Sequence, residues 1–232
     1  MLDFTPDGLG IPVSIPSEHG LLHGELGELP QSPGIIVLAH AAATLDRKDM
    51  LLAGQFRRSG LSTLSVDLTA HQEEHFPDVL NNVPLLARRL VDFLGLLKNR
   101  MLMGGLRQQP VGLFAANATS PVVIRVAALR DHDIAAIVCR GGLIDLAGVL
   151  YLRALESPLL LLEEDSDAAH LASNRRAFQE ITCRKERRII PEIGPDLATA
   201  TGLASHIDNA TQWFFECFAT HAHQGESNDA QE

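Results

Sequence analysis

Residues 111–120 read Val-Gly-Leu-Phe-Ala-Ala-Asn-Ala-Thr-Ser, and they predict a buried strand that turns sharply into a helix. Residues 111–115 are apolar throughout, as expected for a strand that helices cover on both faces. Ser120 and Pro121 follow, and they suit the cap and the first turn of a helix. Asn117 therefore stands at the turn. Its carboxamide has neither a hydroxyl nor a thiol, so it cannot serve as the usual acyl-transfer nucleophile.

Apolar runs alternate with amphipathic segments on both sides of this stretch. Repeated strand–helix units with wholly apolar strands predict an α/β fold, in which a mostly parallel sheet is flanked by helices in three layers. Residues 18–28 contain three glycines and predict a preceding edge strand or hairpin. The predicted strands are 34–40, 61–68, 111–115, 134–139, 158–162 and 188–193, and the predicted helices are 51–58, 84–98, 121–130, 168–180 and 202–219.

The length of 232 residues suits one domain or at most two. We predict an N-terminal extension over 1–17, one α/β domain over 18–220 and a disordered tail over 221–232. The tail prediction rests on its lack of apolar side chains that could be buried.

Several stretches between residues 18 and 219 together resemble dienelactone hydrolase-like members of the α/β-hydrolase superfamily. That family places its nucleophile in a turn of the form G-x-S-x-G. At the corresponding positions this chain has Ala115, Asn117 and Thr119. The resemblance is carried by Ala39-His40, Ser-Val-Asp-Leu at 65–68, Pro-Leu-Leu-Ala-Arg-Arg-Leu at 84–90, Gly-Leu-Phe-Ala-Ala at 112–116, Cys-Arg-Gly-Gly-Leu-Ile-Asp-Leu-Ala at 139–147, Ser-Pro-Leu-Leu-Leu-Leu at 157–162 and Asn-Arg-Arg-Ala at 174–177.

The resemblance implies a degenerate catalytic triad. The nucleophile position falls on Asn117, the acid position on Asp167, and the histidine position on Pro195. Proline has no imidazole, so it cannot replace the general base of the triad. His206, further downstream, is interpreted as a helix residue rather than as a substitute base.

The resemblance places the oxyanion region at His40, Ala41 and Ala118. Active relatives have a glycine-rich turn after the histidine, whereas alanines stand at 41–43 here. Alanine resists the positive φ that glycine adopts freely. His40 is interpreted first as a packing and hydrogen-bonding residue at a strand end.

These losses predict a catalytically inactive homologue with a binding, regulatory or scaffolding role. The alternative is a hydrolase that cleaves an ester or lactone through a non-standard active site. We expect no cofactor, a small-molecule ligand in the relic pocket, and a homodimer or a protein partner. The final helix carries four aromatic residues that form either an exposed interface or part of the core: Trp213, Phe214, Phe215 and Phe218.

Charge and cysteine content restrict the other functions. The net charge is -10, so a uniformly basic surface is excluded and nucleic acid is not an expected partner. No run approaches the roughly 18 apolar residues of a membrane span, so no membrane association is expected. Three cysteines without a signal peptide predict reduced thiols and a cytoplasmic location. The basic run at 184–188 is interpreted as a solvated helix end that leads into a strand.

Two segments could hold a metal ion, but we predict no metal site. His71 and His75 match the short zinc signature H-x-x-E-H, which would require a helix and a third ligand. The acidic segment 163–167 offers carboxylates, although short charge runs are usually solvated. Cys139 follows a buried strand with no histidine expected beside it, which predicts an inert thiol.

Overall fold

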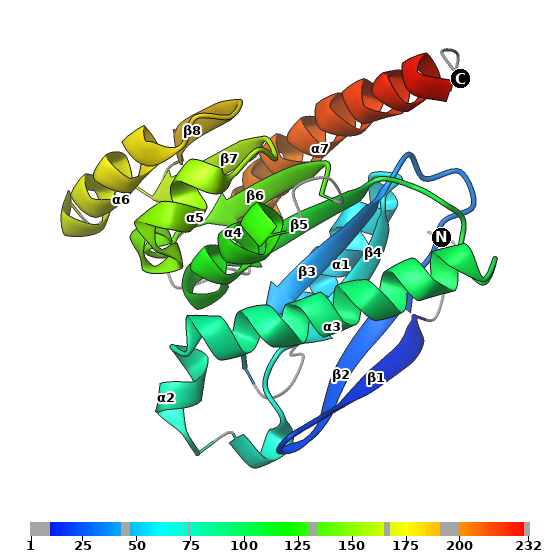
Figure 1. Cartoon of the computed structure of the whole chain (residues 1–232), viewed down its shortest axis with the longest axis horizontal. Helices are drawn as coiled ribbons and strands as arrows, with labels where there is room; N and C mark the ends of the chain where they lie inside the picture. The colour runs from blue at the N-terminus through cyan, green and yellow to red at the C-terminus, as the bar shows by residue number, and fades with distance from the viewer. Residues whose placement is uncertain are drawn as a thin grey trace.

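Eight strands form one sheet in the computed structural model, which describes residues 10–42, 47–73, 75–129, 134–164, 168–190 and 200–229 (Figure 1). The strands are β1 (Ile11–Ser17), β2 (Gly20–Gly27), β3 (Ile35–His40), β4 (Ser62–Asp67), β5 (Val111–Ala116), β6 (Ala136–Arg140), β7 (Leu159–Glu164) and β8 (Lys185–Ile190). Their order is β1-β2-β4-β3-β5-β6-β7-β8. β2 pairs antiparallel with β1 and β4, and the pairs from β4 through β8 are parallel. The predicted fold class is confirmed.

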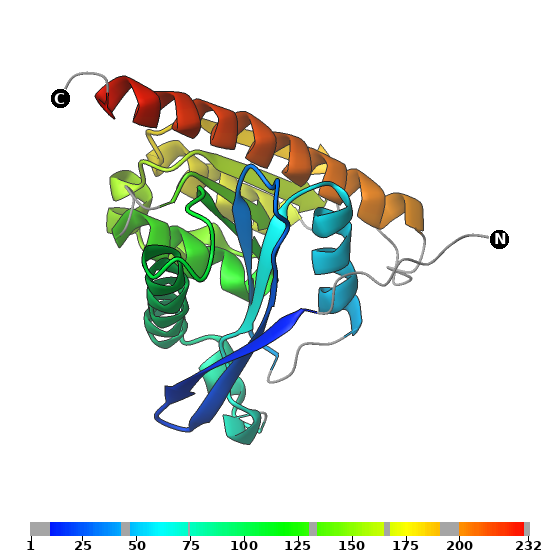
Figure 2. The ribbon, with the colours of Figure 1, turned by 90° about the vertical axis from the view of Figure 1, so that its right-hand side faces the viewer.

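Helices cover both faces of the sheet and complete three layers. The α-helices are α1 (Arg47–Arg58), α2 (Pro77–Leu80), α3 (Val83–Leu102), α4 (Ser120–Leu129), α5 (Val149–Ala154), α6 (Ala168–Glu180) and α7 (Ala200–Asp229). In Figure 2, α1 and α7 lie on one side of the sheet, and α3 and α4 lie on the other. β3 supplies both cores, because Ile35 and Val37 face the α3–α4 side while Ile36 and Leu38 face the α1–α7 side. Burial on both faces explains why the central strands are apolar without alternation.

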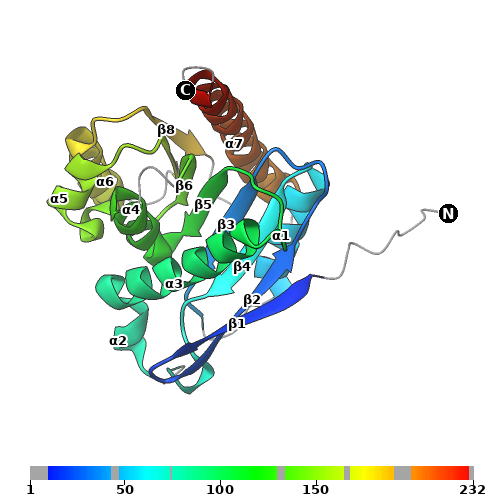
Figure 3. The ribbon, with the colours of Figure 1, turned by 45° about the vertical axis from the view of Figure 1, so that its right-hand side comes forward.

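Two strands differ from their predicted positions. β1 lies within residues 1–17, which the sequence suggested as an extension, and it pairs with β2 along Ile11–Ser17. β8 begins at Lys185 rather than at residue 188, because its pairing with β7 starts at Leu159 opposite Lys185. β8 is an edge strand, so it tolerates the charged side chains that obscured it in the sequence. Figure 3 shows the β1–β2 hairpin and β8 at opposite ends of the sheet.

The final helix uses its aromatic residues for the core. Trp213, Phe214 and Phe218 are fully buried, whereas Phe215 is exposed. The buried positions recur at helical spacing, and they pack with Phe56 of α1 against the sheet. The interface alternative is therefore wrong for three of the four rings. The helical backbone also continues to Asp229, into the segment 221–232 that composition suggested to be disordered.

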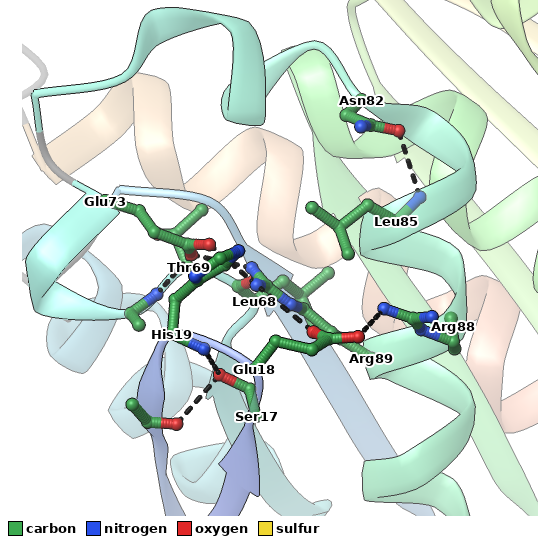
Figure 4. A network of polar contacts seen from close by, with 12 residues as sticks. Ser17, Glu18, His19, Leu68, Thr69, Glu73, Asn82, Leu85, Arg88 and Arg89 are labelled. Carbon is green, nitrogen blue, oxygen red and sulfur yellow. Dashed lines mark hydrogen bonds and ion pairs between the residues drawn. The ribbon is translucent and has the colours of Figure 1, made fainter.

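A buried ion pair anchors the segment after β4 to α3 (Figure 4). Both guanidinium Nη atoms of Arg89 lie 2.7 Å from the two carboxylate oxygens of Glu73. Arg89 also donates to the carbonyl of Leu68, and the Ala70 amide donates to Glu73. The hydrogen bond from Arg89 holds the pKa of Glu73 below its usual value. This pair fixes the polar loop that follows β4 close to the carboxyl edge of the sheet.

Candidate functional site

The turn after β5 keeps the strained backbone of a nucleophile turn. Asn117 has a φ of 53°, and it is the only non-glycine residue with positive φ among the residues that the structure describes. It begins the short 3-10 helix η2 (Asn117–Thr119), which leads directly into α4. Asparagine tolerates left-handed backbone better than most L-residues. The predicted strand–turn–helix at Asn117 is therefore present, with an exposed carboxamide at its apex.

Thr119 braces this turn. Its Oγ1 lies 2.9 Å from the carbonyl oxygen of Ala39, to which it donates, and it accepts from the Ala116 amide at 3.3 Å. The hydroxyl thus ties the end of β3 to the end of β5. In the sequence, Thr119 stands only as a replacement for the second glycine of the turn motif. Its hydrogen bond to Ala39 could not be predicted, because the sequence does not specify that β3 and β5 are neighbours.

A glycine turn after β6 packs against the Asn117 backbone. Gly141 and Gly142 both have positive φ, at 63° and 79°. A Cβ atom on Gly142 would overlap the carbonyl group of Asn117. Ser120, which the sequence suggested as a helix cap, instead donates its hydroxyl to the Gly141 carbonyl at 2.8 Å. The two turns therefore form one unit.

Asn174 on α6 holds the glycine turn from the other side. Its Nδ2 lies 2.8 Å from the carbonyl oxygen of Gly142 and 3.0 Å from a carboxylate oxygen of Glu163, and its Oδ1 accepts from the Ile144 amide. Glu163 is buried and also pairs with Arg187. Sequence reasoning missed Asn174, because one polar residue on an amphipathic helix carries no signal of its partners.

These elements surround a cavity of about 540 Å³ at the carboxyl ends of β5, β6 and β7. That size lies within the usual range of small-molecule sites. Asn117, Ala118, Arg140, Glu164 and Leu146 are among its lining residues. The acidic segment and the glycine motif, which lie apart in sequence, therefore meet over Asn117.

The structure separates the suggested oxyanion residues. Ala118 lines the cavity, whereas His40 and Ala41, at the end of β3, are not among its lining residues. The next amide, that of Ala42, lies 3.4 Å from Asp67 Oδ1, a carboxylate that also accepts from Thr69. An amide that faces a carboxylate is poorly placed to stabilise a second negative charge.

The other titratable candidates are enclosed. Cys139 is fully buried, and burial raises the pKa of its thiol to about 12, so it stays protonated. His206 on α7 is 3% exposed, and neither ring nitrogen has a hydrogen-bond partner among the described residues. Burial, and secondarily the charge of Arg140, lowers the pKa of His206 to about 4. A thiolate nucleophile at Cys139 is thus disfavoured.

Neither metal candidate assembles in the part of the chain that is described. His71 lies in the 3-10 helix η1 (His71–Glu73), and His75 follows in a turn, so the pair lacks the α-helix that the zinc signature requires. In the acidic segment, Glu163 and Glu164 contact arginines. No cluster of three metal-ligating side chains occurs among these residues. Asp167 and Pro195, the predicted acid and histidine positions, lie outside the described residues.

The basic run after α6 is neutralised rather than free. Arg184 contacts Glu216 and stacks over Trp213, and Arg188 pairs with Glu186. None of the helices within the described ranges combines the length and the apolar character needed to cross a bilayer.

Comparison with solved structures gives the same architecture. A dienelactone hydrolase from Anabaena variabilis superposes with a TM-score of 0.77 at 26% identity, covering 89% of this chain and 97% of that one. A cold-adapted esterase from an Arctic intertidal metagenomic library superposes with a TM-score of 0.66 at 16% identity, covering 87% of this chain and 92% of that one. The fold resemblance suggested by the sequence is therefore confirmed.

Sequence comparison finds longer relatives. Proteins from two strains of Mycobacterium tuberculosis, provisionally described as phosphoribosyl transferases, are 31% identical over 166 residues, which is 70% of this chain and 37% of theirs. The chain thus spans little more than a third of the length of these curated relatives. No family model matches the chain.

Proposed function

Because this chain is a dienelactone hydrolase-like member of the α/β-hydrolase superfamily by its fold, we propose that it is a non-hydrolytic member that binds a small molecule in the cavity over Asn117. One observation carries the proposal. Asn117 occupies the positive-φ apex of the turn, yet it offers a carboxamide where covalent catalysis needs a hydroxyl or a thiol. A turn that keeps its backbone geometry without its nucleophile can still position a ligand.

The surroundings support loss of hydrolysis. Cys139 lies on β6, and burial in the core raises the pKa of its thiol and keeps it protonated. His206 is buried and does not line the cavity, so its imidazole is not placed to take a proton from a water bound there. The Ala42 amide is directed toward Asp67. The thiol of Cys139 and the imidazole of His206 are therefore buried, and the Ala42 amide faces a carboxylate.

The cavity supports retained binding. Its walls come from five separate segments, and hydrogen bonds from Ser120 and Asn174 join four of them. A site built on fixed turns and strand ends is preorganised, which lowers the cost of binding. We propose that such binding has a regulatory or scaffolding role. The proposal does not include phosphoribosyl transfer, because this chain spans only part of the longer relatives described by that activity.

Hydrolysis of p-nitrophenyl esters and of a lactone tests the proposal directly. We expect the purified protein and its Asn117→Ala variant to give the same rate as buffer. Asn117→Ser should gain little, because triad members act as a unit. The double variant Asn117→Ser with Pro195→His has the better chance of activity.

A clear result against the proposal would be turnover by the unmodified protein that survives repurification and is lost in Asp167→Ala. That outcome would establish the alternative, an ester or lactone hydrolase with a non-standard site. Asp167 is the triad position that the sequence retains, so it is the variant that discriminates between the two functions.

Location and assembly are further proposals. The three cysteines are free, which suits a reducing compartment such as the cytoplasm. A homodimer or a protein partner stays a prediction, and light scattering of the purified chain tests it.

A further inference from the structure

Arg140 is a charged cavity residue that makes few contacts with the described residues. It ends β6 and lines the cavity, and its side chain is 19% exposed. Its recorded ionic contact is with Glu164, at 3.6 Å and through a single Nη atom. A guanidinium carries five N–H donors, so most of them have no acceptor among the residues that the structure describes. A partly exposed ion pair of this length is weak.

Two other polar residues of the lining, Glu163 and Asn174, are already hydrogen-bonded. Both carboxylate oxygens of Glu163 are bound, one by Asn174 and the other by Arg187. Asn174 uses its amide nitrogen and oxygen on the glycine turn and on Glu163. A ligand that enters the cavity therefore meets Arg140 as a charged donor with few contacts to the described residues.

Asn117 offers a neutral partner in the same cavity. Its carboxamide makes no hydrogen bond to the described residues, and it lines the cavity together with Arg140. Ala116, just before it, pairs in register with Arg140 across β5 and β6, which places the two side chains at adjacent strand ends. An amide can donate to an oxygen of a ligand that the guanidinium also binds.

Part of the lining is apolar. Leu143, Leu146 and Leu171 lie on this part of the cavity, and Leu146 is 58% exposed. An exposed leucine at a cavity rim is covered at low cost by an apolar ligand segment.

We infer that the ligand is a small organic anion whose charged group binds Arg140 and Asn117, and whose apolar part covers the leucines. The inference rests on the proposed function and gives its ligand a chemical class. Carboxylate and phosphate monoester groups share the required chemistry, since both accept paired hydrogen bonds from arginine.

Three probes with one six-carbon tail separate charge from shape: hexanoate, hexyl phosphate and hexanamide. Backbone amide shifts in an NMR titration report both affinity and place. We expect hexanoate or hexyl phosphate to shift Gly141, Gly142 and Ala118, and hexanamide to bind more weakly. The tighter of the two anions identifies the charged group.

Substitutions test whether Arg140 and Asn117 bind the charged group of the ligand. Arg140→Gln should weaken anion binding by about tenfold or more, as expected for a lost charge-assisted hydrogen bond. Arg176→Gln is the matched control, because Arg176 is an exposed residue on α6 that does not line the cavity. Asn117→Asp keeps the side-chain shape but adds a negative charge, so it should also weaken the anions.

Equal binding of hexanamide, unchanged anion affinity in both Arg140→Gln and Asn117→Asp, or no shift with any probe would overturn the inference. None of these binding results bears on hydrolysis. The proposed loss of catalysis is tested separately by ester turnover. If Arg140→Gln does not fold, Asn117→Asp and the comparison with hexanamide still test whether the cavity binds an anion.

Discussion

Gly142 lies so close to Asn117 that a single added carbon would overlap the Asn117 carbonyl group. Both residues have positive φ, at 79° and 53°. The turn after β5 and the turn after β6 therefore depend on each other, and the floor of the cavity is one packed unit. This contact gives a physical reason for the Arg140-Gly141-Gly142 stretch in the sequence.

Gly142→Ala should destabilise the protein strongly. A left-handed alanine and the forced overlap together should cost about 2–4 kcal/mol. The control is Gly95→Ala in α3, where a Cβ meets no atom within 4 Å, so we expect a gain of roughly 0.5–1 kcal/mol. Urea unfolding of both variants measures the difference. Equal midpoints would contradict the close contact.

The backbone at Asn117 should discriminate between substitutions by shape. Asn117→Val should lower the free energy of unfolding by about 1–2 kcal/mol, because a β-branched residue resists positive φ. Asn117→Gly should leave the unfolding midpoint nearly unchanged, since glycine adopts this conformation freely. If valine and glycine gave the same midpoint in urea, the strained turn would not exist in solution.

The buried pair of Arg89 and Glu73 should tolerate the loss of neither partner. Glu73→Leu removes both close carboxylate contacts of the Arg89 guanidinium and leaves it, among the described carboxylates, only the exposed Glu18 at 3.9 Å. Because Arg89 is 1% exposed, we expect a loss of about 3–5 kcal/mol. Combining it with Arg89→Met should recover much of that loss, because the pair is then replaced by apolar side chains. Exposed Arg88→Gln is the control and should change stability little. A double variant as unstable as Glu73→Leu alone would contradict this account.

His206 should cause the first decrease in the free energy of unfolding as pH falls. Its pKa in the folded protein is lowered to about 4, so the unfolded chain takes up a proton first as pH falls below its usual value of 6.5. Stability should therefore decrease as pH falls from 6.5 to about 4, by no more than about 3 kcal/mol.

His206→Phe should remove that part of the decrease and keep the loss at lower pH. Glu73 has a lowered pKa, so its stabilisation is present above the unfolded value and is lost only as pH falls further through its folded pKa. Urea unfolding from pH 7 to pH 4 measures the profile. An unchanged profile in His206→Phe would show that another group controls it.

The sequence by itself determined the class of fold and the side chain that stands at the turn after β5. Uninterrupted apolar strands such as Ile35–His40 require cover on both faces, and this local pattern is enough to predict a parallel sheet. The carboxamide of Asn117 cannot itself act as a hydroxyl or thiol nucleophile, whatever surrounds it. Strands β1 and β8 were misplaced because edge strands carry polar residues, so their apolar pattern is weak.

Only the tertiary structure decided which residues meet. Asn174 lies on α6, far along the chain from Gly142, and their hydrogen bond follows from the order of β6, β7 and the returning helix. The burial of Trp213 depends on the sheet face that α7 covers, which no local pattern specifies. Arg140 is a cavity residue because a parallel sheet brings the carboxyl ends of neighbouring strands to one edge, and that proximity comes from strand order rather than from spacing along the chain.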